Sequence, residues 1–450
     1  MWSKARELAE MTPPERNRWV DFLRAVSILA VVCGHWLMAG VYVDEAGALQ
    51  RGDLLSVSTW AHWLTWIFQV MPVFFLVGGY SNGVSWDATL RKAEPGQIGK
   101  YRDWFASRVQ RLINPIFPLL MLWAVLAVIL TQAGFPREQI RMATEAALIP
   151  VWFLAVYLLV TACTPLTYSA WKRFGWASFA WFIPVAVLTD WLTFTAQVPY
   201  VNFTNFLWVF LALHQLGFAW RDGRFDNRLF ALGWFVAGLG VLVSITVYGF
   251  YPVSMVSQPG ELSNSLPPTL ALFALGVAQV GLVLALEPWG RRMLDNLNLW
   301  TATVLMNGMI MTVYLWHLTA FVLVMTACWV LLGGWCLDHV PGSPTWWASR
   351  PLWFAVYIAA LLPMIAVFAR HERSFGPVRG GRTVPKARVV AGVALICVGL
   401  AATAGVTITS PDSLSGIRAS VVAAPFVGAA LMGFGPIYDM ITRRRKKRDP

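Results

Sequence analysis

The stretch RWVDFLRAVSILAVVCGHW, residues 18–36, is an apolar run that contains a guanidinium and an imidazole. An α-helix rises about 1.5 Å per residue, so roughly 20 residues cross the ~30 Å hydrocarbon layer of a bilayer. Eleven positions separate Arg24 from His35, which is about three turns plus 20°, so both side chains share one helical face about 16 Å apart. Charged groups at membrane depth cost about 2.5–3.5 kcal/mol each on insertion scales and are functional candidates by default. The stretch therefore predicts a membrane-spanning helix with a functional stripe.

The rest of the chain has the same apolar character. It is 450 residues long, 57% hydrophobic and only 13% charged, which excludes an ordinary soluble globular protein. We predict an all-α polytopic membrane protein of about twelve transmembrane helices, ten in a core and two more at the C-terminus. The predicted spans lie near residues 19–40, 60–82, 112–133, 148–168, 175–194, 203–220, 229–250, 269–287, 301–333, 351–369, 389–408 and 418–441.

The distribution of basic residues predicts the orientation of these spans. If both termini are cytoplasmic, 29 of the 35 Lys and Arg residues fall on the cytoplasmic side, five on the other side, and Arg24 lies within a span. This asymmetry is the positive-inside pattern. The net charge of +12 is then explained by topology, and we expect no nucleic-acid partner. The tail RRRKKR, residues 443–448, fits both plain orientation and binding to anionic membrane lipids.

These spans and charges predict five segments. They are a cytoplasmic N-terminal segment (1–18), a ten-span membrane domain (19–370), a basic cytoplasmic loop (371–388), two additional transmembrane helices (389–441) and a basic cytoplasmic tail (442–450).

Few ionisable side chains lie within the predicted spans. If the ninth span begins near Thr301, His317 lies at the same depth as His35, so the two imidazoles are expected to share one site. Asp190, in the outer half of the fifth span, is a candidate to orient one of them. His214 fits a site residue and a packing histidine equally well.

A purely structural interpretation of Arg24 and His35 is also open. Arg24 can extend to the headgroups while His35 forms a hydrogen bond to a neighbouring helix. Asp21, three residues before Arg24, can instead pair with the guanidinium and hold it in place.

A second cluster precedes the third span, where Arg108 and Arg111 are three residues apart on one helical face. Paired guanidinium groups suit bidentate binding of phosphate, although basic residues at this place also follow from the topology alone. No span contains the H-x-x-x-H or H-E-x-x-H spacing of a zinc site, so we expect no metal.

Five segments, taken in order, resemble those of the integral membrane acyltransferase 3 family. The first is residues 18–36, with its Arg, ten intervening residues and His. The others are MPVFFLVGGYSNG (71–83), FASRVQRLINP (105–115), VWFLAVYL (151–158) and VYLWHLTAF (313–321). The second segment departs from the family by having two glycines where Ser-Gly is usual.

The resemblance implies transfer of an acyl group, commonly acetyl, from coenzyme A to a hydroxyl of a carbohydrate, glycolipid or small molecule. His35 would be the catalytic base, Arg24 would help to position the donor, and Arg108 and Arg111 would contact the phosphates of acyl-CoA. Neutral imidazole is suited to accept a proton from a hydroxyl. Four side chains are candidates to line the site and stabilise the oxyanion: Ser81, Asn82, Tyr314 and Trp316.

We expect a multi-pass protein of a bacterial inner membrane, with acetyl-CoA as donor, a hydroxyl-bearing acceptor and membrane lipids as its partners. The two spans after residue 388 have no counterpart among the ten that resemble the family. We expect a stand-alone membrane form without the secreted esterase-like domain that some members carry.

Two other functions remain open. A twelve-span secondary transporter would use the same intramembrane His, Arg and Asp side chains as a proton or substrate path. The connection between the sixth and seventh spans, residues 221–228, is too short for the long central loop that joins two six-span halves, and no motif of the first span recurs in the seventh. A catalytically inactive lipid-binding or assembly protein is the other alternative.

Overall fold

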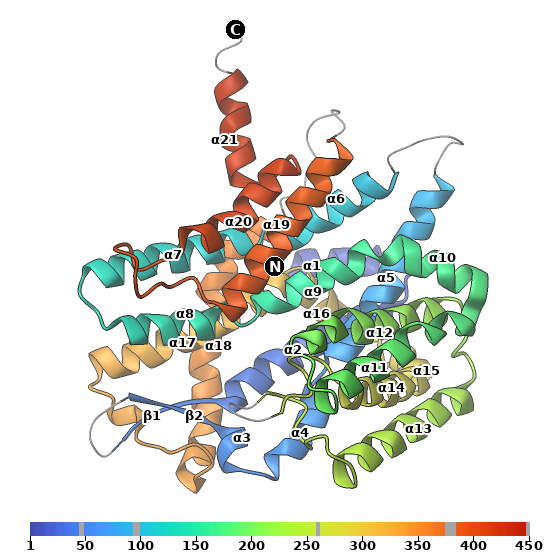
Figure 1. Ribbon diagram of the computed structural model, residues 1–450, viewed down its shortest axis with the longest axis horizontal. Helices are drawn as coiled ribbons and strands as arrows, with labels where there is room; N and C mark the ends of the chain where they lie inside the picture. The colour runs from blue at the N-terminus through green and yellow to red at the C-terminus, as the bar shows by residue number, and fades with distance from the viewer. Residues whose placement is uncertain (45–48, 93–99, 258–261, 374–383, 447–450) are drawn as a thin grey trace. The chain divides into compact units, whose positions relative to one another are not determined.

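A computed structural model describes residues 1–44, 49–92, 100–257, 262–373 and 384–446 of the chain. Within these ranges the regular structure is helical apart from one antiparallel hairpin of two strands (Figure 1). The chain divides into two compact units. Unit 1 comprises residues 1–88, 160–308 and 339–347, and unit 2 comprises residues 89–159, 309–338 and 348–450.

Unit 1 contains the N-terminal helices, the hairpin and a central group of helices. Its elements are α1 (Trp2–Glu10), α2 (Arg18–Met38), β1 (Ala39–Val43), β2 (Leu49–Asp53), α3 (Leu54–Val57), α4 (Ala61–Phe68), α10 (Thr164–Phe174), η1 (Gly175–Ala180), α11 (Phe182–Phe194), η2 (Val201–Thr204), α12 (Asn205–Arg221), α13 (Arg228–Val247), α14 (Leu270–Ala285), α15 (Glu287–Met293) and α16 (Leu297–Asn307), with most of α5 (Met71–Arg91).

Unit 2 contains helices that come before and after this central group in the sequence. Its elements are α6 (Lys100–Ile113), α7 (Ile116–Gln132), α8 (Arg137–Leu148), α17 (Ile310–Leu331), η3 (Trp335–Leu337), α19 (Lys386–Gly405), α20 (Ala419–Leu431) and α21 (Gly435–Lys446), with most of α9 (Val151–Ala162) and α18 (Pro344–Arg373).

The helices confirm a polytopic, all-α membrane protein. Among the described residues eight helices are long and apolar enough to cross a membrane, or up to eleven if each of three bent pairs is one span. The predicted sixth span, α12, is 17 residues long and is buried along most of its length. The total of twelve spans and the cytoplasmic position of both termini stay predictions. Residues 374–383 of the predicted basic loop and 447–450 of the predicted basic tail lie outside the described residues.

The predicted ninth span is not one helix, and this part of the prediction is wrong. Helix α16 ends at Asn307, Gly308 is its C-cap, and α17 begins at Ile310. His317 is therefore the eighth residue of α17, while His35 is the eighteenth residue of α2. The premise that both imidazoles lie equally far into their helices is lost.

Helix α2 is fixed at its start by a capping side chain. Asn17 accepts a hydrogen bond from the Trp19 backbone nitrogen at 3.0 Å, which satisfies one of the free N–H groups at the helix end. The Trp19 indole nitrogen donates to the Val283 carbonyl at 3.0 Å, and its ring covers Gly290, where any Cβ would overlap it. The N-terminal end of α2, which is predicted to lie on the cytoplasmic side, is thus held against α14 and α15.

The C-terminal helices α19 and α20 pack closely against each other in unit 2 (Figure 1). A Cβ on Gly392 would lie 2.6 Å from the Gly428 carbonyl oxygen, and a Cβ on Gly428 would lie 2.5 Å from the Gly392 oxygen. Small residues of this kind allow close backbone approach, which is a principal source of helix association in membranes. Helix α20 also meets α7, where the ring centroids of Phe117 and Phe426 are 4.7 Å apart. The C-terminal pair therefore packs against the α6–α7 segment.

Candidate functional site

Arg24 connects α2 to α5 within unit 1. Its Nη1 atom donates to Asp21 Oδ1 at 3.2 Å, and its Nη2 atom donates to Ser81 Oγ at 2.9 Å. The second carboxylate oxygen of Asp21 accepts from Arg16 Nε at 2.6 Å. The buried Asp21 carboxylate thus lies between two guanidinium groups, which offset the cost of removing it from water. The predicted pairing of Asp21 with Arg24 is present, and Arg24 points to α5.

Helices α5 and α12 cross at two glycines. A Cβ on Gly79 would overlap the backbone oxygen of His214, and a Cβ on Gly217 would overlap the Leu76 oxygen and the Tyr80 nitrogen. Only glycine permits this backbone approach. Gly79 is the position that is also glycine in the usual Ser-Gly of the family, so the crossing explains this glycine and not the departure at Gly78.

The glycine crossing brings the buried side chains of Asn82 and His214 together. Asn82 Nδ2 lies 3.1 Å from His214 Nε2 and 3.4 Å from Thr161 Oγ1. Because an amide nitrogen only donates, His214 accepts through Nε2, and the neutral ring carries its proton on Nδ1. His214 Nδ1 is buried and has no hydrogen-bond partner in the described part of the chain. Two residues predicted to line the site are therefore in direct contact.

His35 lies on the same continuous helix as Arg24. Helix α2 runs unbroken from Arg18 to Met38, so the eleven-residue spacing keeps the two side chains on one face, about 16 Å apart along the axis. The backbone oxygen of His35 accepts from the Ala39 nitrogen at the end of the helix. Its imidazole is partly buried.

Asp190 is part of a network of hydrogen bonds in unit 1. Its Oδ1 atom accepts from Asn205 Nδ2 at 2.7 Å, and its Oδ2 atom accepts from the Tyr251 hydroxyl at 2.7 Å and the Leu270 nitrogen at 2.9 Å. Burial raises the pKa of Tyr251 above its ordinary value, and its hydrogen bond to Asp190 raises the pKa further. These contacts connect the segment after α13 to α11, α12 and α14. A role for Asp190 in orienting an imidazole stays a prediction.

His317, Tyr314 and Trp316 belong to unit 2. The buried His317 ring forms a 2.6 Å hydrogen bond through Nδ1 to the Tyr314 carbonyl oxygen. Since a carbonyl only accepts, Nδ1 carries a proton, and in the neutral ring Nε2 is the nitrogen that can accept one. The Tyr314 hydroxyl donates to the Pro150 carbonyl at 2.8 Å, and the Trp316 ring stacks on Phe368 with centroids 3.9 Å apart. The joint site of His317 and His35 stays a prediction.

The two arginines predicted to contact phosphate lie on α6, also in unit 2. Arg111 is exposed, while Arg108 is partly buried, with its guanidinium carbon 5.6 Å from the centroid of the Trp104 ring. A contact of this kind with an indole ring orients a guanidinium. Helices α6 and α7 meet at a bend of 41°. Pro115 lies at this junction, and it has no backbone N–H to continue the hydrogen bonds of α6.

Sequence reasoning missed the partners that hold several of these side chains. Asn205 and Tyr251 lie 15 and 61 residues from Asp190, and no local pattern indicates that they meet. Among the described residues no group of three or more His, Cys, Asp and Glu side chains is placed to share a metal ion.

Comparison with known proteins identifies the family. A family model described as an acyltransferase domain, of the acyltransferase 3 type, matches residues 17–370. No curated protein and no solved structure matches the chain. The matched range contains Arg24, His35, the glycine crossing, both α6 arginines and His317, and it ends before α19. The predicted resemblance is confirmed, and the chain belongs to the acyltransferase 3 family.

Proposed function

We propose that this membrane acyltransferase transfers an acyl group, expected to be acetyl, from cytoplasmic acyl-CoA to a hydroxyl of a carbohydrate, glycolipid or small molecule. Membership of the family supports acyl transfer in general. The residue-level observation that carries the proposal is the contact of Arg24 with Asp21 on α2 and with Ser81 on α5. Helix α2 also carries His35. Such an arrangement fixes a cation within the helix bundle, where an isolated charge would be costly.

Donor binding is assigned to three arginines. Arg108 and Arg111 lie one turn apart on α6 and supply charge-assisted hydrogen bonds to phosphate oxygens. Arg24 keeps its guanidinium in a defined orientation and helps to position the donor. The bound coenzyme supplies the activated thioester.

His35 is assigned as the general base. A neutral imidazole accepts a proton from the attacking hydroxyl, a contribution of roughly 10²- to 10⁴-fold in rate. Ser81, Asn82, Tyr314 and Trp316 remain the candidates for hydrogen bonds to the developing oxyanion. Asn82 already donates to His214, which holds its amide in one orientation.

His317 is the alternative base, and one contact supports it. The hydrogen bond from Nδ1 to the Tyr314 carbonyl leaves the neutral ring with its basic nitrogen at Nε2. Separate His35→Gln and His317→Gln variants distinguish the two assignments. We expect the His35 variant to lose transfer and keep donor binding, and the His317 variant to keep at least part of the transfer.

The experiment that tests the function compares cell envelopes with and without the protein. Mass spectrometry of glycans and lipids should show an acyl group that depends on the protein, and purified protein should bind acetyl-CoA. An unchanged acyl profile together with no binding of acetyl-CoA would contradict the proposal. The expected location in a bacterial inner membrane is checked by fractionating the same cells.

A further inference from the structure

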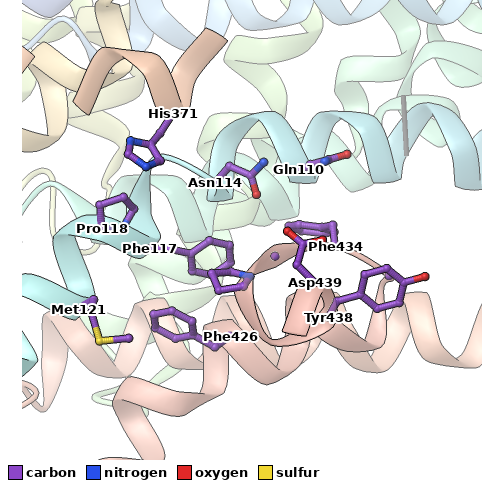
Figure 2. A pocket seen from close by; sticks show the side chains of 13 residues that line it. Gln110, Asn114, Phe117, Pro118, Met121, His371, Phe426, Phe434, Tyr438 and Asp439 are labelled. Atoms are coloured by element: carbon purple, nitrogen blue, oxygen red, sulfur yellow. The ribbon is translucent and has the colours of Figure 1, made fainter. Parts of the chain in front are cut away.

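Unit 2 contains a cavity of about 520 Å³ that involves the C-terminal helices (Figure 2). It lies between the α6–α7 junction, the end of α18 and the bend between α20 and α21. The family match ends at residue 370, so His371 and every lining residue from α20 and α21 lie beyond it. A cavity of this volume is in the range of small-molecule sites.

The shape of the cavity follows from the bend in the C-terminal pair. Helices α20 and α21 meet at 55°, and Gly433 and Gly435 have φ values of +86° and +88° at the junction. This left-handed conformation favours glycine. On the opposite wall, the Asn114 backbone nitrogen donates to the Gln110 backbone carbonyl at 3.0 Å, so these two residues lie one helical turn apart. Both line the cavity, as do Tyr438 and Asp439 of α21 (Figure 2).

Five polar side chains line the cavity without partners of their own in the described part of the chain. The buried His371 Nδ1 has no hydrogen-bond partner. Gln110, Asn114, Tyr438 and Asp439 also line the cavity, and none of these four side chains takes part in a hydrogen bond or ion pair among the described residues. Asp439 is exposed and the other three are partly exposed. Buried polar atoms normally have a partner, so the His371 Nδ1 atom marks a place for a ligand group. The other four side chains offer such a ligand further donors and acceptors.

Aromatic rings form the remaining part of the lining. Phe117 and Phe426 are buried and pack against each other, while Phe434 and Tyr438 come from the bend and α21 (Figure 2). Aromatic faces bind planar rings by stacking, at about 1–3 kcal/mol per nucleobase. Carboxamides are the side chains that pair with the edge of adenine, because each offers a donor and an acceptor.

Charge decides where a phosphate could lie. The Asp439 carboxylate repels an anion inside the cavity and accepts hydrogen bonds from amino or hydroxyl groups. Arg111 is exposed, follows Gln110 on α6 and is not among the residues that line the cavity. Consecutive side chains on a helix point about 100° apart, so we assign Arg111 to phosphates that lie outside the cavity. A purine base in the cavity with its phosphates outside suits this separation.

We propose that the cavity binds the adenine end of the acyl-CoA donor, with the C-terminal helices α20 and α21 as one wall of this subsite. The inference rests on the proposed function, because it takes acyl-CoA as the donor. It also assigns a role to the two helices after the family match, which is to increase affinity for the nucleotide part of the donor.

The test measures binding of adenosine 3′,5′-bisphosphate to the purified full-length protein, with acetyl-CoA as competitor. Tyr438→Leu removes the stacking ring and Asn114→Ala removes an amide, and each should weaken binding about tenfold. Tyr438→Phe keeps the ring and should bind within about threefold of the parent protein. Phe203→Leu, an exposed aromatic of η2, is the matched control and should change nothing.

A second donor separates this inference from the proposed function. Acetyl-pantetheine lacks the nucleotide, so Tyr438→Leu and Asn114→Ala should leave its reactivity unchanged while raising the KM for acetyl-CoA. Two results would overturn the cavity assignment alone. In one, both variants bind the bisphosphate as tightly as the parent protein. In the other, the variants lose as much activity with acetyl-pantetheine as with acetyl-CoA. Failure of the parent protein to bind acetyl-CoA would overturn the proposed function as well.

Discussion

The guanidinium of Arg24 on α2 donates a 2.9 Å hydrogen bond from Nη2 to the Ser81 hydroxyl on α5. Its Nη1 atom holds the buried Asp21 carboxylate at 3.2 Å. The side chain of Arg24 is 28% exposed, which differs from an arginine that extends freely to lipid headgroups. The contact therefore makes Arg24 a fixed cation between two helices of unit 1, and its role in orienting the donor is part of the proposed function.

Arg24→Lys should lower acyl transfer more than it lowers stability. Lysine keeps the charge but cannot contact Asp21 and Ser81 with the same planar group. We expect kcat/KM for acetyl-CoA to fall about tenfold or more, equivalent to about 1.4 kcal/mol of transition-state stabilisation. Ser81→Ala is the matched variant, because it removes one acceptor and leaves the guanidinium in place. Equal activity of Arg24→Lys and the parent protein would exclude Arg24 from the site.

Gly79→Ala should destabilise unit 1. The added methyl would overlap the backbone oxygen of His214, so α5 and α12 must separate, at a cost of about 1–3 kcal/mol. Gly240→Ala is the control, since a Cβ there meets nothing within 4 Å. The melting temperature in detergent should fall for the first variant only. An unchanged value for Gly79→Ala would mean that this crossing is not tightly packed in solution.

The class of fold could be predicted from the sequence because the length of each apolar run is a local property. Breaks in helices were harder, since the apolar run through 301–333 hides the change from α16 to α17 at Gly308. The Arg24–Asp21 pair follows from spacing along one helix. The contact of Asn82 with His214 does not, because it depends on how α5 crosses α12, 132 residues later.

Asp190 and Tyr251 should be coupled energetically. Their 2.7 Å hydrogen bond joins α11 to the segment after α13. Tyr251→Phe and Asp190→Asn should each reduce the free energy of unfolding by about 1 kcal/mol or more, because a buried group loses its partner. In a double-mutant cycle the combined loss should be smaller than the sum. Strict additivity would show that the hydrogen bond adds no stability.

Asn82→Leu should disturb the site through His214. The substitution leaves His214 Nε2 buried without its donor, at a cost of about 1–3 kcal/mol in stability. Since Asn82 is also an oxyanion candidate, kcat should fall while the KM for acetyl-CoA changes little. Thr161→Val, which removes the longer 3.4 Å contact of the same amide, is the milder control. A rise in the KM for acetyl-CoA with an unchanged kcat would assign Asn82 to donor binding.

The central claim is that His35 accepts the proton during acyl transfer from a cytoplasmic donor. The most direct measurement is the acyl content of envelope glycans and lipids, by mass spectrometry, in cells that produce either the parent protein or His35→Ala at equal membrane levels. The account predicts that His35→Ala leaves the acyl group absent while the purified variant still binds acetyl-CoA. An acyl group restored to the parent level by His35→Ala would contradict it.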